Sequence, residues 1–164
     1  MKEEKAKVSV EQIYRSRLTE KCVTYDDGWM RWEAFPEPEP TGFPEMDALG
    51  KLLARTPVPS VQAVTLAMGM PLSILRAFVQ GYTGMNLTEF IVCYRLLVGE
   101  ELLRCTDLDL TSIARCAGYQ REVFSRKFSA HYGQSPKDYR YFKRPNRFRE
   151  LYRWDNQKLK KMER

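Results

Sequence analysis

The sequence predicts an all-α protein in which two helix-turn-helix units are joined by a long spacer helix. Residues 60–84 and 109–133 share one pattern: a capped helix, a glycine that ends it, and a second helix with inward-facing hydrophobic residues. Between these units, apolar residues recur at helical spacing. No strand pattern follows residue 36. We expect a short non-helical N-terminal arm and a basic C-terminal helix to flank this body.

The chain divides into three parts by composition. Residues 1–43 form an arm that closes with a PEPEP linker, where each proline lacks a backbone donor and restricts the residue before it. Residues 44–144 carry the helical pattern and are predicted to form the main domain. Residues 145–164 are a polar, basic tail that we expect to extend as another helix.

One stretch of the arm has two interpretations. The sequence VTYDDGWMRWEAF, residues 23–35, contains a turn signal at Asp27 and Gly28. It forms a hairpin with Trp29 and Trp32 as packing anchors, or it remains a loosely held arm.

The first unit follows a helix that starts at Pro44 and stops at a TPVP sequence. Ser60 is placed to cap the first helix of residues 60–84, and Gly69 to end it. Pro71 suits the first turn of the second helix. The residues expected to face inward from that helix are Leu75, Phe78 and Val79.

The spacer helix is predicted over 89–104, because Asn86 and Glu89 have the spacing of a capping box. At 1.5 Å per residue it would be roughly 24 Å long. In the second unit, Asp109 is the predicted cap. The turn residues and inward anchors of this unit are Gly118, Tyr119, Phe124 and Phe128.

Small residues mark where the two helices of each unit would cross. A steep crossing needs a small side chain on the first helix, and the turn after it needs a glycine with positive φ. Ala114 and Gly118 meet this requirement in the second unit, Thr65 and Gly69 in the first. Ala114 fits better, because the β-branch of Thr65 is bulkier at a close crossing.

Charge is unevenly placed along the chain, which holds 27 Lys and Arg against 21 Asp and Glu, a net charge of +6. Residues 1–59 hold 9 basic and 11 acidic side chains, residues 60–144 hold 11 and 7, and residues 145–164 hold 7 and 3. The basic excess therefore belongs to the paired units and the tail. Such a domain favours polyanions through phosphate contacts and counterion release.

Other site chemistry is not expected. The four cysteines form no C-x-x-C pair and the single His131 has no cysteine at ligand spacing, which argues against a zinc site. Neither a Gly-rich phosphate loop nor carboxylates at catalytic spacing occur, so we expect no catalytic residues and no cofactor. The first residues lack the apolar core of a signal peptide, and no run reaches the ~20 apolar residues of a membrane span. We expect a cytoplasmic protein without membrane contact.

The stretch IARCAGYQREVFSRKFSAHYGQSPKDYR, residues 113–140, combines Ile-Ala, Gly-aromatic, Phe-x-x-x-Phe and Gly-x-Ser-Pro-x-x-Tyr-Arg. It resembles the DNA-binding domain of the AraC/XylS family of bacterial transcription regulators, and the resemblance extends over about 44–144. It implies seven helices, of which two are recognition helices that enter adjacent major grooves on one face of DNA. One departure is a turn of four residues at 120–123 where the family usually has five; the first unit also has four, at 71–74.

Candidate contacts lie on the outer face of each second helix. Arginine reads guanine edges in the major groove, and Asn or Gln reads adenine. Phosphates are expected to be bound by basic residues and by amides at the helix N-termini. Arg140 has packing as an alternative role, and Arg95 on the spacer is expected to be structural. The base-reading candidates are Ser73, Arg76, Gln80, Gln120, Arg121, Glu122, Ser125 and Arg126. The phosphate candidates are Lys127, Arg140, Lys143 and Arg144.

Two functions remain open at this point. The first is a sequence-specific regulator, acting in the bacterial cytoplasm on the nucleoid, that binds two adjacent boxes of double-stranded DNA as a monomer. The alternative is an interaction module that binds RNA polymerase or another regulator, with weak or non-specific DNA binding. The first recognition helix opens with PLSI, which offers few donors to base edges and favours the alternative. A small-molecule effector is not expected, because only about 43 residues precede the domain.

Overall fold

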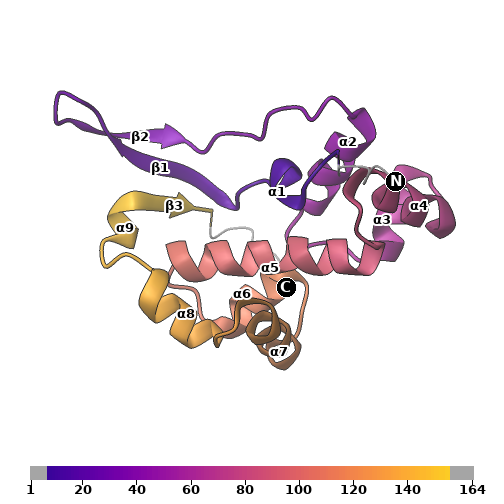
Figure 1. Ribbon diagram of the computed structural model, residues 1–164. Helices are drawn as coiled ribbons and strands as arrows, with labels where there is room; N and C mark the ends of the chain where they lie inside the picture. The colour runs from indigo at the N-terminus through magenta and orange to yellow at the C-terminus, as the bar shows by residue number, and fades with distance from the viewer. Residues whose placement is uncertain (1–6, 156–164) are drawn as a thin grey trace, which may run out of the picture.

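The computed structural model describes residues 7–155 and shows a helical body with a small sheet at one end (Figure 1). A helix ahead of the first unit, the two units, the spacer and a final helix make up the body. In chain order they are α2 (Pro44–Leu53), α3 (Val61–Met68), α4 (Leu72–Thr83), α5 (Leu87–Cys105), α6 (Leu110–Ala117), α7 (Arg121–Tyr132) and α8 (Pro136–Lys143). Two single-turn helices flank them: α1 (Val10–Ile13) and α9 (Phe148–Leu151).

The helix ends confirm the predicted caps and turns. The side chains of Ser60, Asn86 and Asp109 each accept a hydrogen bond from the backbone N–H three residues later. Gly69 and Gly118 end α3 and α6 in the left-handed conformation, with φ of 61° and 88°. Capping side chains and positive-φ glycines are local signals, and for this reason the sequence is sufficient to place these boundaries.

The spacer helix α5 is the centre of the core. It runs from Leu87 to Cys105 and is therefore longer than the predicted range of 89–104. Phe90 and Tyr94 are fully buried toward the first unit's end, and Val98 and Leu102 toward the second. All four belong to one hydrophobic cluster that draws residues from both units. The two units are therefore parts of one packed body, with α5 running through its middle (Figure 1).

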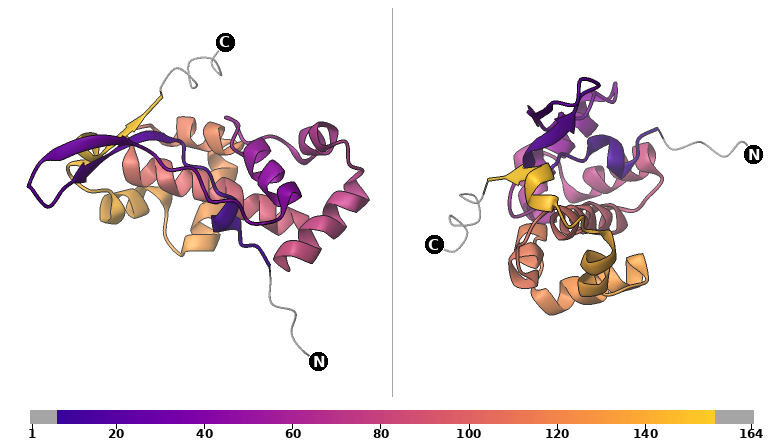
Figure 2. Two further views of the ribbon diagram at one scale, coloured as in Figure 1. Left: turned by 90° about the horizontal axis from the view of Figure 1, so that it is seen from above. Right: turned by 90° about the vertical axis from the view of Figure 1, so that its left-hand side faces the viewer.

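A three-stranded antiparallel sheet joins the two ends of the chain. It contains β1 (Leu18–Thr24), β2 (Met30–Ala34) and β3 (Tyr152–Trp154), in the order β2-β1-β3. The hairpin interpretation of residues 23–35 is thus confirmed. Its two strands reach beyond the helices at one end of the molecule (Figures 1 and 2).

Three details of the flanking segments differ from the prediction. The arm is not purely non-helical, since Ser9 and Gln12 form a full capping box on α1. The tail contains only the short helix α9 before the strand β3, where no strand was expected, and residues 156–164 lie outside the described part. Trp32 is packed beneath the Arg153 guanidinium at 3.8 Å, whereas Trp29 is 70% exposed at the hairpin tip and is no anchor.

The arm is held against α5 by a buried carboxylate. Glu101 accepts hydrogen bonds from the Tyr14 hydroxyl (3.1 Å), the Ser16 hydroxyl (2.8 Å) and the Arg17 backbone N–H (2.6 Å). Burial raises the pKa of Glu101. Because the aliphatic residues of α1 enter the main core as well, the arm is packed onto the body.

Within residues 7–155, no single helix is long and apolar enough to cross a membrane. Helices α3 and α4 pass that test of length and composition only as a pair, and they are bent by 94° at the turn between them.

Candidate nucleic-acid interface

The second unit is locked by contacts on both sides of its turn. Ala114 is fully buried at the crossing of α6 and α7, and its carbonyl accepts a hydrogen bond from Tyr119 N–H at 2.8 Å. Phe124 and Phe128, both fully buried, fix α7 against the core. These anchors determine which face of α7 is turned toward solvent.

The outward face of α7 carries the predicted base-reading side chains. Gln120, Arg121, Glu122 and Arg126 are exposed, and Ser125 is half-buried. The Gln120 side chain accepts no hydrogen bond from the first backbone N–H groups of α7. At the preceding helix the situation differs, because the Ser112 N–H bonds Asp109 and lowers the pKa of that carboxyl.

The first unit presents a less polar face. Leu75 and Val79 are fully buried and hold α4 to the core, while Phe78 stacks edge-on with Tyr82 at 5.0 Å between ring centroids. The candidates on the opposite face, Ser73, Arg76 and Gln80, are exposed. Gln80 donates locally to the Gly84 carbonyl at 3.2 Å. Leu72 and Ile74, at 40% and 53% exposure, occupy the start of the same helix.

Arg95 ties the two units to the spacer. Its Nη1 donates to the carbonyl oxygen of Gly118 at 2.9 Å, and its Nη2 to that of Pro59 at 3.3 Å. Its guanidinium also lies over the ring of Tyr119, 5.0 Å from the centroid. The expected structural role of Arg95 is confirmed, but its partners are carbonyls and a ring rather than an acidic neighbour. One side chain thus contacts the residue before the first unit and the turn of the second.

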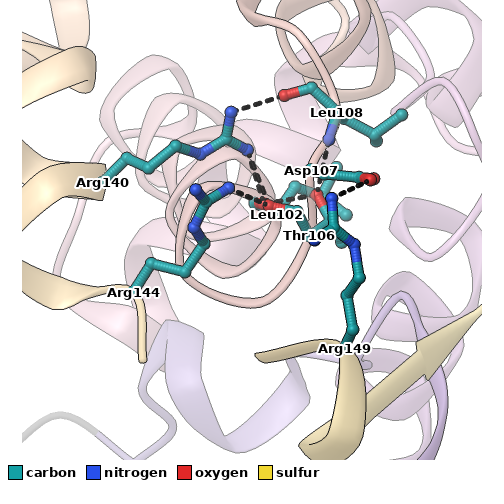
Figure 3. Close-up of polar contacts among 7 residues, drawn as sticks. All are labelled: Leu102, Thr106, Asp107, Leu108, Arg140, Arg144 and Arg149. Atoms are coloured by element: carbon teal, nitrogen blue, oxygen red, sulfur yellow. Dashed lines mark hydrogen bonds and ion pairs between the residues drawn. The ribbon is translucent and has the colours of Figure 1, made fainter. Parts of the chain in front are cut away.

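Arg140 requires a correction. Its guanidinium donates four hydrogen bonds, at 2.6 to 3.2 Å, to the carbonyl oxygens of Leu102, Leu103, Thr106 and Leu108. Figure 3 shows Arg140 with three of these acceptors, Leu102, Thr106 and Leu108. The last carbonyls of a helix have no intrahelical partner and favour a cation. Burial, together with the Arg144 charge, lowers the pKa of Arg140 to about 10, so it stays protonated at neutral pH. Its role is to cap α5, which leaves it poorly placed to bind phosphate.

The other phosphate candidates differ in how much they are engaged. Arg144 donates from Nη1 to the Thr106 carbonyl at 3.0 Å and lies 4.2 Å from the Phe148 ring centroid. Lys127 is half-buried, with its Nζ 5.9 Å from the Tyr119 centroid. Lys143 is exposed. Of the four candidates, Lys143 therefore has the charged group that is most accessible to a phosphate.

The end of α5 gathers a basic cluster that sequence reasoning did not assemble. Arg149 joins Arg140 and Arg144 there by donating to the Asp107 carboxylate at 3.1 Å (Figure 3). Tyr139 adds a hydrogen bond from its hydroxyl to Glu100 at 2.7 Å. The sequence signal for this cluster is the Tyr-Arg pair at the end of the motif, for which packing is the alternative to DNA contact.

A family model described as a helix-turn-helix domain matches residues 64–141, which include the turns of both units. No curated protein matches the sequence. The solved structures that share the fold include the C-terminal domain of AraT, a response regulator from Geobacillus stearothermophilus. It is 23% identical, covers 56% of this chain and 76% of its own, and has a TM-score of 0.51.

Two other solved structures extend the comparison. A transcriptional regulator from Chromobacterium violaceum, of the group containing AraC-type DNA-binding domains, is 21% identical over 57% of this chain and 86% of its own, with a TM-score of 0.51. The xylose-binding transcription activator xylR is 21% identical over 69% of this chain but only 35% of its own, with a TM-score of 0.54. At these identities the likeness concerns the fold. The family match and these structures show a helix-turn-helix domain with the fold of AraC-type DNA-binding domains, and the motif at 113–140 resembles that of the AraC/XylS family.

Proposed function

We propose that this regulator reads two adjacent major-groove boxes of double-stranded DNA, with α4 in one box and α7 in the other, and that one copy of the chain contacts both. The observation that carries the proposal is the bridge made by Arg95. The Arg95 guanidinium contacts Pro59, just before the first unit, and Gly118 in the second. These bonds hold α4 and α7 in a fixed relative orientation. Recognition helices on one duplex face would be about 34 Å apart, one helical turn.

The second unit supplies most of the base contacts in this proposal. Arg121 and Arg126 are suited to guanine, Gln120 to adenine, and Glu122 to the amino group of cytosine. Ser125 is able to hydrogen-bond several bases. Each good bidentate contact contributes roughly 1–3 kcal/mol of discrimination between bases.

The first unit contributes fewer polar contacts. Arg76 is its one strong donor, Ser73 a weaker one, and Gln80 would exchange its bond to Gly84 for a base edge. The exposed Leu72 is suited to the thymine methyl group. We therefore expect the box read by α4 to be shorter and more tolerant than the box read by α7.

Phosphate contacts in this account come from Lys127 and Lys143, with the unused donors of Arg144 and the first amides of α7. Arg140 is not in this set, because its guanidinium donates to backbone carbonyls. The DNA-binding domain spans residues 44–144. In this proposal the protein acts in the bacterial cytoplasm on the nucleoid.

A second function is favoured by one observation on the first unit. Leu66 is 78% exposed on α3, and Ile74 is 53% exposed on α4. An apolar hollow of about 550 Å³ lies between α2 and α3, lined in part by Leu52, Met68 and Met70. A surface of this kind suits a contact with RNA polymerase or another regulator, and such a contact would add to DNA binding or replace it.

Paired variants on the two recognition helices test the proposal. Arg76→Ala with Gln80→Ala, and Arg121→Ala with Arg126→Ala, should each weaken binding to a selected site by about ten- to hundredfold relative to random DNA. Lys51→Ala on α2 serves as the control outside both helices. Unchanged specific affinity in the α4 variant would exclude the two-box reading, and weak, salt-insensitive DNA binding by the unsubstituted protein would favour the interaction module.

A further inference from the structure

The outer side of β2 is an unpaired strand edge. In the part of the chain that the structure describes, β2 is the first strand of the order β2-β1-β3, and only its inner side meets β1. Phe35 N–H donates to Thr19 at 2.9 Å and Tyr25 N–H to Trp29 at 2.9 Å, so the odd-numbered residues of the second strand face β1. The backbone N–H and C=O groups of successive strand residues point to opposite sides of the strand. Met30, Trp32 and Ala34 therefore direct their N–H and C=O groups outward, away from β1.

This edge lacks most of the features that usually block strand addition. Natural edges are protected by charged side chains, above all lysine, by proline, by a bulge or by very short length. The β2 sequence MRWEA has neither lysine nor proline, and its pairing with β1 is regular from Glu20 to Thr24. The opposite edge, β3, has three residues and an irregular register beside Leu18. Of the two edges, β2 is therefore the one open to a further strand.

We propose that β2 pairs antiparallel with β2 of a second copy of this chain, with Trp32 on the two-fold axis. In this register Met30 faces Ala34 of the partner subunit, and Arg31 faces Glu33 of the partner subunit. The register makes the outward residues hydrogen-bonded pairs, so the Arg31–Glu33 pairs are the closer, non-hydrogen-bonded kind. Two ion pairs form, one on each side of the axis.

The charge pattern selects this register over its neighbours. Sliding one strand by two residues in one direction sets Arg31 opposite Arg31 of the partner subunit. Sliding it by two residues in the other direction sets Glu33 opposite Glu33 of the partner subunit. Like charges directly opposite each other are destabilising across a strand pair. Arg31 now lies 3.8 Å from the Asp27 carboxylate, with both side chains more than half exposed, and 4.9 Å from the centroid of the Tyr25 ring. An exposed ion pair of this kind contributes little and is easily exchanged.

The other face of the strand adds apolar contact. Met30, 48% exposed, and Ala34 lie on the same side of β2 as Trp32. In the dimer this side would carry a continuous row of apolar side chains across the axis. Five-residue strands make a small interface, typical of weak association. Two copies bound at neighbouring sites would raise the effective concentration and strengthen it.

The inference goes beyond the proposed function, in which one copy is sufficient for one pair of boxes. An isologous dimer would arrange two such pairs as an inverted repeat.

Charge reversal tests the pairing in solution without DNA. Sedimentation equilibrium would compare the full chain, R31E, E33R, an equimolar mixture of the two, and the double variant R31E/E33R. Each single variant should self-associate about tenfold more weakly, because both ion pairs become like-charge pairs. The mixture should associate more strongly than either variant alone, since one chain then carries two acidic and the other two basic residues. The double variant should recover the original association.

Two further variants keep the test independent of general effects. D26K changes a charge in the turn outside the paired residues and should leave association unchanged. A34P removes an outward N–H and should abolish association while the β1–β2 ladder persists, which its thermal melting would check. The proposal is overturned if the unsubstituted protein stays monomeric up to its solubility limit, if mixing brings no gain, or if A34P still dimerises.

Discussion

Gly99 of α5 faces the aromatic ring of Phe124 in α7 so closely that a Cβ atom at Gly99 would overlap the ring carbons Cε2 and Cζ. Both residues are buried. The missing side chain lets α7 approach the spacer, and this approach sets the direction in which α7 presents its outer face. Gly99→Ala should destabilise the protein by about 1–3 kcal/mol, because the ring has to move in a packed core. It should also weaken DNA binding, since α7 is displaced with the ring.

Gly81 offers the matched control. It lies inside α4, and a Cβ there would meet no atom within 4 Å. Gly81→Ala should therefore leave stability unchanged or raise it by up to about 1 kcal/mol through helix propensity. Urea unfolding of both variants measures the difference. Equal stability of the two variants would contradict the close approach of α7 to the spacer.

Arg140 and Lys143 are expected to separate stability from binding, although both are basic residues of α8. Arg140→Ala removes four hydrogen bonds to carbonyls at and just beyond the end of α5 and should cost about 2–3 kcal/mol. Lys143→Ala should change stability by less than about 0.5 kcal/mol. It should reduce the salt dependence of DNA binding by about one phosphate contact. Thermal melts and binding at several salt concentrations measure both effects, and a fully stable Arg140→Ala protein would refute the capping role.

Arg121 and Lys127 should differ in what they do to specificity. Arg121→Ala should relax preference at one base pair and cost about 1–3 kcal/mol at the preferred site. Lys127→Ala should weaken binding by a similar factor on every sequence, since phosphates carry no sequence information. Binding to a set of sites with single base changes distinguishes the two patterns. Uniform weakening by Arg121→Ala would remove it from the base-reading group.

Glu101 makes the stability of the protein depend on pH. Burial raises its pKa in the folded protein above the value of about 4.3 in the unfolded chain. A raised pKa means that the folded state holds the proton more tightly. The contribution is fully present below the unfolded pKa and is lost as pH rises through the folded pKa.

Glu101→Gln, which does not titrate, provides the reference for this effect. The stability of the unsubstituted protein relative to Glu101→Gln should fall as pH rises from about 4 toward 7. Urea unfolding at several pH values gives the two curves. A relative stability that rises with pH would mean that the bonds from Tyr14, Ser16 and Arg17 outweigh the cost of burial.

The helical body could be predicted because its determinants are local. Ser60, Asn86 and Asp109 bond to residues three positions away, and the turns need only Gly69 and Gly118. The apolar anchors that follow each turn could be predicted from helical spacing. In this way both units and the outward faces of α4 and α7 could be predicted from the sequence.

The flanking segments could not be predicted in the same way, because their partners are far away in the chain. The Arg153 guanidinium covers Trp32, and the Tyr14 hydroxyl donates to Glu101 in the C-terminal part of α5. A tail of three strand residues has no periodicity to detect. The sequence predicts a phosphate contact for Arg140 for a related reason: nothing in the neighbouring residues indicates that distant backbone carbonyls accept its hydrogen bonds.

Selection of sheared genomic DNA by the purified protein, followed by sequencing of the retained fragments, tests the two-box account most directly. The account predicts enrichment of one motif with two boxes roughly ten base pairs apart, the box for α7 being the more strictly defined. Retention of fragments without a shared motif, or of a motif with one box only, would contradict it.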